Sequence, residues 1–227
     1  MEETWKRREY ETWDEAFRGL APAVRQQSVR VAAYTQALFV QACSGPFGKD
    51  TREGSEEMRG AYADLAYKCG MYHQIGKALV PPEYQVWQPD FTEEERAVYR
   101  KYTTDGRALA TALQEGGGRE KRRETKNIPW RMIRESCEQH MERWDGSGYP
   151  DGLKGDEIPM TVQAVGLADA YDALVSQRVY KPAYTHAEAL AMIRGGECGA
   201  FDPLLVDCLE DIQSALCREV YGMRGKE

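Results

Sequence analysis

The fold is decided by the stretch ERWDGSGYPDGLKGDEIP at residues 142–159, which separates two helical patterns. Before it, apolar side chains between Trp130 and Met141 recur on one helical face, and after it Val165 and Asp169 share a helical stripe. The stretch itself is rich in glycine and proline, so it predicts a turn between two helices. Because no run of alternating strand residues occurs elsewhere in the sequence, we expect an all-α fold.

Composition and charge limit the class of partner. The 227 residues are 42% hydrophobic and 30% charged, which is typical of a globular protein. A net charge of −7 repels the phosphate backbone of DNA or RNA, so a long nucleic acid is not expected as a partner. The sequence has no long uncharged apolar window and no secretory signal pattern, which predicts a cytoplasmic protein without membrane association.

We expect one domain over residues 1–227, with an N-terminal helix at 1–21 and two halves at 22–115 and 128–220. The segment 116–127 between the halves has no apolar residue and therefore predicts a flexible connector. The N-terminal helix is predicted to be amphipathic, so it packs on the body or on a second copy in a homodimer. Its apolar residues are Trp5, Tyr10, Trp13, Phe17 and Leu20.

Three patterns place helices in the first half. A second helix is expected to begin at Pro22, with Gln27 on its inward stripe. A later helix is expected to continue towards the segment HQIGK at 73–77. The Thr-x-x-Glu pattern at 92–95 predicts a capped, long helix that carries Tyr102 on its apolar face.

Three groups on inward helical stripes are chemically unusual for a core, namely His73, His140 and Asp169. Two imidazoles and one carboxylate are the ligand types that bind iron, manganese or zinc. Their wide spacing alone favours the simpler interpretation of hydrogen-bonded core residues. His186 directly follows the Thr185 helix cap, so we expect it to be exposed and assign it no role.

Five motifs together closely resemble the HD-GYP family. They are HQIGK at 73–77, the stretch at 142–159, ADAYDAL at 168–174, RVYKPA at 178–183 and GAFDPLLV at 199–206. Members of this family are metal-dependent phosphohydrolases of bacterial signalling, and their usual substrate is cyclic di-GMP. The resemblance implies an HD-superfamily multi-helix bundle with a GYP-type loop, made of an HD half at 22–115 and a GYP half at 128–220.

The same resemblance indicates that most metal ligands of the family are missing here. The positions that keep a ligand are His73, His140 and Asp169. The positions that have lost one carry Gln27, Gln74, Tyr102 and Met141. Gln74 stands where the family has a bridging carboxylate, and a neutral amide cannot neutralise two cations. We therefore expect no resident cofactor, with one weakly held Fe, Mn or Zn ion on the three remnant ligands as the alternative.

The resemblance also implies a phosphate site and a docking loop. The phosphate contacts would be Lys77, Arg178 and Lys181, whose alternative role is that of solvated surface cations. Lys77 would also serve catalysis if the chain is active. The residues of the loop beside the site are Gly148, Tyr149 and Pro150, and in the family this loop is a proposed docking surface for proteins with a GGDEF domain.

Three functions follow as hypotheses. The first is a degenerate, inactive HD-GYP pseudoenzyme that binds cyclic di-GMP, another nucleotide or a partner protein. The second is a metal-dependent phosphodiesterase with an unconventional, mononuclear site. The third is a structural dimerisation module built on the N-terminal helix. Whether Tyr102 and Met141 fill a packed core or line a nucleotide pocket stays open, as does substitution of the lost ligands by Glu57, Asp64 or Glu142.

Overall fold

Every regular element in the described part of the chain is helical, which confirms the predicted all-α class. The computed structural model describes residues 9–44, 56–116, 130–177 and 182–221. The elements are α1 (Trp13–Arg18), α2 (Pro22–Ser44), α3 (Glu56–Tyr72), η2 (Ile75–Leu79), η3 (Pro82–Tyr84), α4 (Glu93–Arg100), α5 (Tyr102–Glu115), α7 (Trp130–Gln139), η4 (Gly155–Glu157), α8 (Met160–Val175), α9 (His186–Arg194) and α10 (Pro203–Tyr221).

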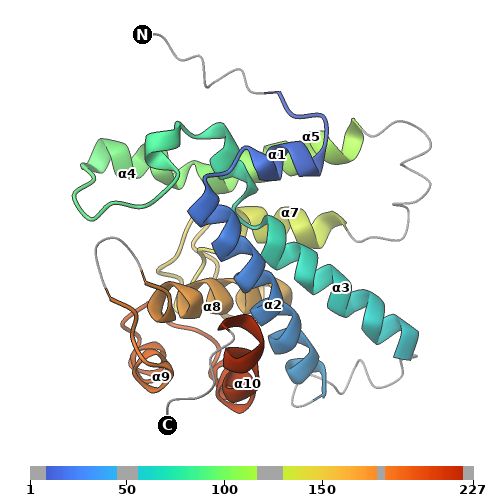
Figure 1. Cartoon of the computed structure of the whole chain (residues 1–227), viewed down its shortest axis with the longest axis vertical. Helices are drawn as coiled ribbons and strands as arrows, with labels where there is room; N and C mark the ends of the chain where they lie inside the picture. The colour runs from blue at the N-terminus through green and yellow to red at the C-terminus, as the bar shows by residue number, and fades with distance from the viewer. Residues whose placement is uncertain (1–8, 45–55, 117–129, 178–181, 222–227) are drawn as a thin grey trace.

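Helix α2 runs through the molecule and contributes to two apolar cores (Figure 1). One core joins α2 to α8, α9 and α10 through residues such as Leu38, Leu167 and Leu209. The other joins the start of α2 to α1, α3, η2, α5 and α7, with Ile75 and Ile133 at its centre. The candidate site lies between these cores, because its residues come from α2, the end of α3, the end of α7 and α8.

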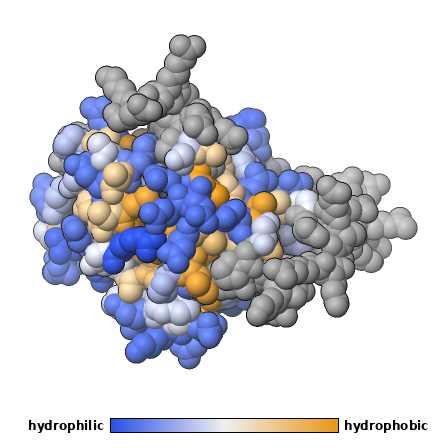
Figure 2. Space-filling model, turned by 90° about the horizontal axis from the view of Figure 1, so that it is seen from below, coloured by the Kyte–Doolittle hydropathy of each residue, from blue (hydrophilic) through white to orange (hydrophobic). Residues whose placement is uncertain are grey.

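The surface seen from the side of α9 and α10 mixes hydrophilic and hydrophobic residues (Figure 2). The large apolar side chains that are exposed in the described residues, such as Val29 and Val40, are few. Isolated exposures of this kind are normal for a globular protein. None of the described helices has the length and apolar character that crossing a membrane requires.

Two predicted helices end earlier than the periodicity indicated. Helix α3 ends at Tyr72, and the HQIGK segment continues as the 3-10 helix η2. The helix predicted from 92–95 breaks at Lys101 into α4 and α5. The hydroxyls of Thr103 and Thr104 donate to carbonyls three residues earlier, at 3.0 and 3.1 Å, and such side-chain bonds compete with the helical ladder.

The N-terminal helix is also shorter than expected. Its capping box is Thr12 with Glu15, so α1 covers only Trp13–Arg18. Trp13 packs on the body, with its ring 4.6 Å from that of Tyr72 and 5.4 Å from that of Trp130. Residues 1–8, and residues 117–127 of the predicted connector, lie outside the described residues.

Gly76 brings η2 into backbone contact with α5. A Cβ atom at this position would lie 2.0 Å from the carbonyl oxygen of Tyr102 and 2.4 Å from the amide nitrogen of Gly106. Only glycine permits so close an approach. This contact places the HQIGK segment, with His73 at its start and Lys77 at its end, directly against the first turn of α5.

Candidate functional site

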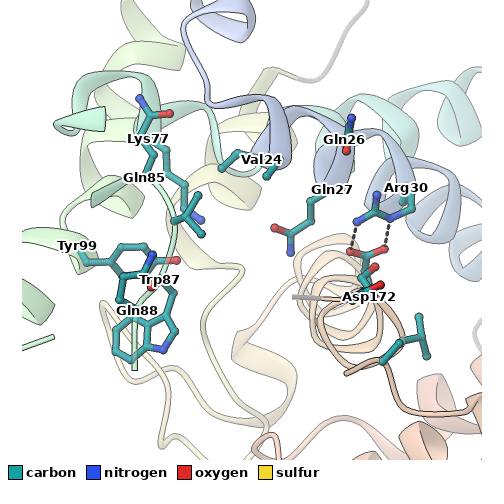
Figure 3. A pocket seen from close by; sticks show the side chains of 16 residues that line it. Val24, Gln26, Gln27, Arg30, Lys77, Gln85, Trp87, Gln88, Tyr99 and Asp172 are labelled. Atoms are coloured by element: carbon teal, nitrogen blue, oxygen red, sulfur yellow. Dashed lines mark hydrogen bonds and ion pairs between the residues drawn. The ribbon is translucent and has the colours of Figure 1, made fainter. Parts of the chain in front are cut away.

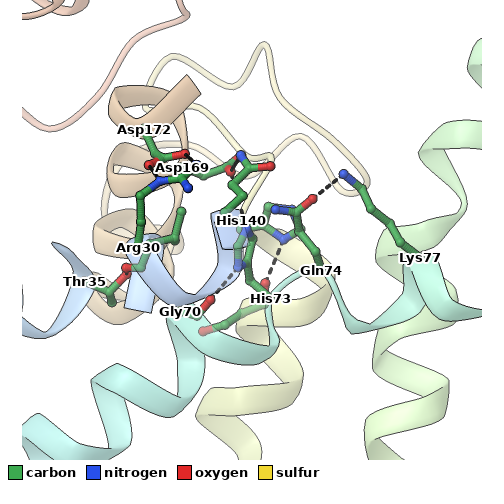
Figure 4. A network of polar contacts seen from close by, with 12 residues as sticks. Arg30, Thr35, Gly70, His73, Gln74, Lys77, His140, Asp169 and Asp172 are labelled. Atoms are coloured by element: carbon green, nitrogen blue, oxygen red, sulfur yellow. Dashed lines mark hydrogen bonds and ion pairs between the residues drawn. The ribbon is translucent and has the colours of Figure 1, made fainter. Parts of the chain in front are cut away.

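The structure brings together the three residues that the sequence singled out as remnant ligands. His73 follows α3, His140 follows α7 and Asp169 lies on α8 (Figure 4). The imidazole rings of His73 and His140 are 4.9 Å apart and nearly perpendicular. His73 Nε2 lies 3.4 Å from Asp169 Oδ1. Both histidines are buried, whereas Asp169 is partly exposed at the edge of the cluster.

Backbone carbonyls fix the orientation of both rings. His73 Nδ1 donates to the carbonyl of Gly70 at 2.6 Å, and His140 Nδ1 donates to the carbonyl of Ser136 at 2.8 Å. A carbonyl can only accept, so each Nδ1 carries a proton in these contacts. The Nε2 atom of each ring therefore points into the cluster, as it would in a metal site.

Side chains at two of the positions predicted to have lost a ligand form hydrogen bonds with Asp169 and His140. The amide Nε2 of Gln27 donates to Asp169 Oδ1 at 2.7 Å. The hydroxyl of Tyr102 lies 2.8 Å from His140 Nε2 and donates to it, because Nδ1 already carries the ring proton. Thus a carboxamide and a phenol satisfy the carboxylate and the imidazole that a cation would otherwise bind.

The pKa values agree with this pairing. Burial, followed by the nearby charge of His73, lowers the pKa of His140 to about 3, so its ring is neutral at pH 7. Burial raises the pKa of the Tyr102 hydroxyl well above its usual range, so it remains an O–H donor. Burial alone would raise the pKa of Asp169, but the hydrogen bond and charge of His73 hold it below its ordinary value.

The other two replaced positions behave differently from each other. Gln74 is buried and accepts a hydrogen bond from the ammonium of Lys77 through Oε1. Its Nε2 is buried without a hydrogen-bond partner among the described residues. Met141 is only half-buried, and its carbonyl accepts the backbone N–H of Tyr149 at 3.3 Å. The packed-core hypothesis therefore suits Tyr102, which is buried, and not Met141.

Of the three predicted phosphate contacts, Lys77 alone lies in the described residues. Its ammonium sits 5.0 Å from the ring centroid of Tyr99 and 4.8 Å from that of Tyr102, within cation–π range. The residue is buried, yet it is one of the residues that line a cavity. Arg178 and Lys181 lie outside the described residues.

The loop with Gly148, Tyr149 and Pro150 is held by a residue whose role the sequence left open. The Glu142 carboxylate accepts the backbone N–H groups of Asp151, Gly152 and Leu153 at 2.7, 3.1 and 3.0 Å. Gly148 packs against Glu142 so closely that a Cβ atom would lie 2.4 Å from its Cα. Glu142 is therefore a structural clamp and is not available as a substitute metal ligand.

The remaining side chains considered from the sequence are Glu57, Asp64 and His186. Asp64 is exposed on α3 and the Glu57 side chain lies outside the described residues, so neither is placed in the cluster. His186 was expected to be exposed and without a role, but it is only partly exposed. Its Nδ1 lies 2.6 Å from the hydroxyl of the buried Tyr171, because α9 packs on α8 at this point.

A cavity of about 440 Å³ opens beside the cluster (Figure 3). One wall comes from η2, α4 and the segment between them, with Lys77, Trp87 and Tyr99. The opposite wall comes from α2 and α8, with Gln27 and Arg30 on α2. Sequence reasoning missed Trp87 and Arg30. The segment that carries Trp87 has no helical period, and Arg30 was detectable only through its position one turn after Gln27 on α2.

The second wall contains an ion pair between Arg30, whose side chain is partly exposed, and a buried aspartate. Arg30 Nε and Nη2 donate to the two oxygens of Asp172 at 2.6 and 2.9 Å. Asp172 is fully buried, and this bidentate geometry neutralises its charge. The pairing of Asp172 with Arg30, 142 residues away in the sequence, could not be read from the sequence.

The residues present do not fit the two-metal centre that the resemblance implies. Within the described ranges no group of three or more His, Cys, Asp and Glu side chains is placed to hold a metal ion. The donors nearest the expected site are already hydrogen-bonded to Gln27 and Tyr102. A phenol and carboxamides also supply no negative charge at pH 7 to offset two divalent cations.

Comparisons with known proteins agree with the helical architecture and with the motifs. The family model described as HD domain matches residues 57–205. A cyclic di-GMP phosphodiesterase from Vibrio cholerae is 38% identical over 180 residues, which is 79% of this chain and 34% of that protein. From the same organism, 3'3'-cGAMP-specific phosphodiesterase 2 is 28% identical over 201 residues, covering 88% of this chain and 34% of that protein.

The solved structure of an HDG"Y"P protein from Bdellovibrio bacteriovorus has the same fold. It matches with a TM-score of 0.57 at 18% identity, covering 84% of this chain and 52% of that one. The chain spans about a third of the length of the curated relatives that it matches. Family model, motifs and fold agree, and the chain therefore belongs to the HD domain family, in its HD-GYP group.

Proposed function

We propose that this chain is a non-hydrolytic HD-GYP domain that binds a cyclic dinucleotide and acts as a signalling module. The observation that carries the proposal is the pair of hydrogen bonds from Gln27 to Asp169 and from Tyr102 to His140. They replace metal–ligand contacts by contacts within the protein. The names of the relatives, which specify cyclic di-GMP and 3'3'-cGAMP, support a cyclic dinucleotide as the ligand class.

Loss of hydrolysis follows from the chemistry of the cluster. In a two-metal phosphodiesterase, the bound ions supply an activated water for attack on phosphorus. Here His140 is neutral and its Nε2 accepts a hydrogen bond from the Tyr102 hydroxyl, so the ring cannot also coordinate a cation through that atom. Burial raises the pKa of the Tyr102 hydroxyl, so it stays protonated and cannot take up a proton from water as a general base. No described group replaces the missing nucleophile.

Binding of a nucleotide requires a cavity and a positive charge but no activated water, and the described residues provide both. The cavity beside the cluster is of a size that holds a small ligand. Lys77 contributes a positive charge to its wall, and an ammonium is a suitable partner for a phosphodiester oxygen. Roles for Arg178 and Lys181 in the same contact stay predictions.

The second candidate is a phosphodiesterase with one metal ion. It is favoured by the names of the relatives and by the 3.4 Å separation of His73 Nε2 from Asp169 Oδ1, which suits two ligands on one ion. Such an ion would need Gln27 to release Asp169. It would bind Fe, Mn or Zn weakly, because only His73 and Asp169 then face it.

Metal analysis and turnover together separate these candidates. We would purify the full chain, soak it with Mn²⁺ or Fe²⁺, and measure bound metal, cyclic di-GMP binding by calorimetry and release of linear dinucleotide. The proposal expects binding with substoichiometric metal and no turnover above a no-protein control. Two bound ions per chain, or steady turnover, would refute it. One bound ion with turnover would establish the second candidate.

A converse variant tests the same proposal by restoring the lost ligands. It carries Gln27→His, Gln74→Asp, Tyr102→His and Met141→His. We expect this variant to bind two metal ions per chain where the wild type binds fewer than one, because each change restores a ligand of the family. The matched control is the triple variant with Gln27→His, Tyr102→His and Met141→His, which keeps Gln74 and therefore lacks the bridging carboxylate. Equal metal content in all three proteins would contradict the assignment of these positions.

Docking of a GGDEF-domain protein on the loop around Tyr149, and self-association through the N-terminal segment, stay predictions. Pull-down with a GGDEF-domain protein, compared between the wild type and Tyr149→Ala, tests the first. Sedimentation of a variant that lacks residues 1–20 tests the second, and an unchanged mass would rule out this segment as the dimer contact.

A further inference from the structure

The cavity wall next to the cluster has the composition of a nucleobase site. Trp87 is half-buried and lines the cavity together with Tyr99, and both stand on the wall opposite Gln27 and Arg30 (Figure 3). Every nucleobase has a flat face that stacks on aromatic rings, whereas a phosphate does not. An aromatic wall in a cavity that also carries Lys77 therefore suits a base attached to a phosphate.

The indole of Trp87 is held rigidly in this position. Its ring meets those of Phe91 and Tyr99 edge to face, with centroids 5.4 and 5.3 Å away, and the guanidinium of Arg96 lies 5.7 Å from its centroid. A ring held on several sides loses little freedom when a ligand stacks on it. Its Nε1–H has no hydrogen-bond partner among the described residues and is available to a ligand.

The polar groups of the cavity are mainly carboxamides. Its lining includes five glutamines, at positions 26, 27, 85, 88 and 177. Gln85 is committed to the backbone of Ala21, Gly19 and Val80, and Gln27 uses its Nε2 on Asp169. The Gln88 side chain makes no hydrogen bond among the described residues and lies beside Trp87 and Tyr99 (Figure 3).

The kind of polar group bears on which base is recognised. A glutamine carboxamide presents one donor and one acceptor, which match N7 and N6–H₂ of adenine. Guanine presents two acceptors, O6 and N7, and these match the paired donors of an arginine. The arginine in this lining, Arg30, already directs its Nε and Nη2 donors at Asp172. The described lining thus favours adenine.

We propose that this cavity binds an adenine base, which stacks on Trp87 and is read by the carboxamide of Gln88. The proposal rests on the proposed function, because it names the base of the nucleotide that the domain would bind. The same base can reach the cavity in a mononucleotide or in a cyclic dinucleotide, so both kinds of probe are needed.

Calorimetry with AMP, GMP, 3'3'-cGAMP and cyclic di-GMP tests the base preference in the full chain. We expect AMP to bind about 5- to 150-fold more tightly than GMP, the range of discrimination that one bidentate base contact supports. Gln88→Leu is expected to equalise the two affinities. GMP binding as tightly as AMP in the wild type would overturn the proposal, as would a preference for AMP that survives in Gln88→Leu.

The stacking contact has its own variants. Trp87→Leu is expected to raise the Kd for AMP by about 5- to 150-fold, and Trp87→Phe to recover most of that loss, because a phenyl ring still stacks. Tyr62→Leu, on the exposed side of α3, is the matched control and leaves the Kd unchanged. Circular dichroism checks the fold of each variant. An unchanged Kd in folded Trp87→Leu would remove Trp87 from the site.

The outcomes distinguish failure of this inference from failure of the proposed function. Binding of cyclic di-GMP without turnover, together with no effect of Trp87 or Gln88, would leave the function standing and overturn the base site. Binding of AMP alone, with the expected response to both variants, would support the base site and contradict a cyclic dinucleotide ligand. Absence of binding for all four probes would overturn both.

Discussion

The clamp formed by Glu142 gives a sharp test of how the loop beside the site is held. Its carboxylate is buried and accepts three backbone N–H groups, two on Oε1 from Asp151 and Gly152 and one on Oε2 from Leu153. Glu142→Gln changes only the second oxygen, which becomes an NH₂ donor or forces the amide to turn. With the NH₂ in place of Oε2 the backbone N–H of Leu153 faces another donor, and with the amide turned the N–H groups of Asp151 and Gly152 both do.

The expected loss of stability in Glu142→Gln has two contributions. A hydrogen bond to a charged acceptor contributes about 1.5–3 kcal/mol, and a buried donor left without a partner costs about 1–3 kcal/mol. Some water reaches Leu153, which is only half-buried, and reduces the second term. We therefore expect Glu142→Gln to lower the free energy of unfolding by about 2–4 kcal/mol.

Urea unfolding and amide hydrogen exchange measure this cost globally and locally. The loop amides of Asp151, Gly152 and Leu153 are expected to exchange about 30- to 900-fold faster in the variant, which is the same free energy expressed as a ratio. The matched control is Glu157→Gln, whose exposed carboxylate accepts one N–H, from Lys154. If both variants lose the same small amount of stability, the clamp does not hold the loop.

Three further predictions concern the cluster and its support. Lowering the pH from 7 to 5 is expected to remove about 2 kcal/mol of stability through His140, because its pKa drops from 6.5 unfolded to about 3 folded. Below pH 6.5 the imidazole binds a proton in the unfolded chain but not in the folded one, so this stability is present above pH 6.5 and is lost below it. His140→Asn is expected to remove this dependence of the free energy of unfolding on pH between about pH 7 and pH 5, as measured by urea unfolding. Gly76→Ala is expected to cost about 3 kcal/mol, since its Cβ would lie 2.0 Å from the Tyr102 carbonyl, whereas Gly60→Ala, with no atom within 4 Å, is expected to be neutral or stabilising by thermal melting. EDTA is expected to leave the melting temperature of the wild type within about 1 °C, because a ligand that does not bind the folded state cannot stabilise it.

The convergence of His73, His140 and Asp169 was predicted from the family resemblance, since helical periodicity predicted only that each of the three faces inward. A helix presents one face to the core, so polar groups on that face must meet other polar groups there. The motifs then supplied which helices face one another. What periodicity cannot provide is the choice of partner, since whether Gln27 bonds to Asp169 depends on side-chain rotamers and on how α2 sits over α8.

The two helix ends that the sequence placed wrongly have different physical causes. The hydrophobic periodicity continues past Tyr72 and past Lys101, but the α-helical backbone is interrupted at both points. At the first point the close approach of Gly76 to α5 requires the tighter 3-10 turn, and at the second two threonine hydroxyls compete for helical carbonyls. The first effect comes from a contact between distant parts of the chain, and the second comes from side-chain bonds that hydrophobic periodicity does not register. Trp87 escaped notice for a related reason, because it lies between η3 and α4, where no period exists to assign it a face.

Gln27 takes part in both the proposed loss of the metal site and the proposed choice of ligand. Its Nε2 neutralises part of the charge on Asp169, and the residue also lines the cavity, so one substitution acts on both sites. A histidine restored at this position would place an imidazole towards the cluster and withdraw a carboxamide from the cavity wall. If the cavity reads adenine mainly through Gln88, the restored variant keeps its preference for AMP over GMP while it gains metal. If that preference falls together with the gain of metal, then Gln27 carries part of the base recognition, and the two functions exclude each other at a single residue.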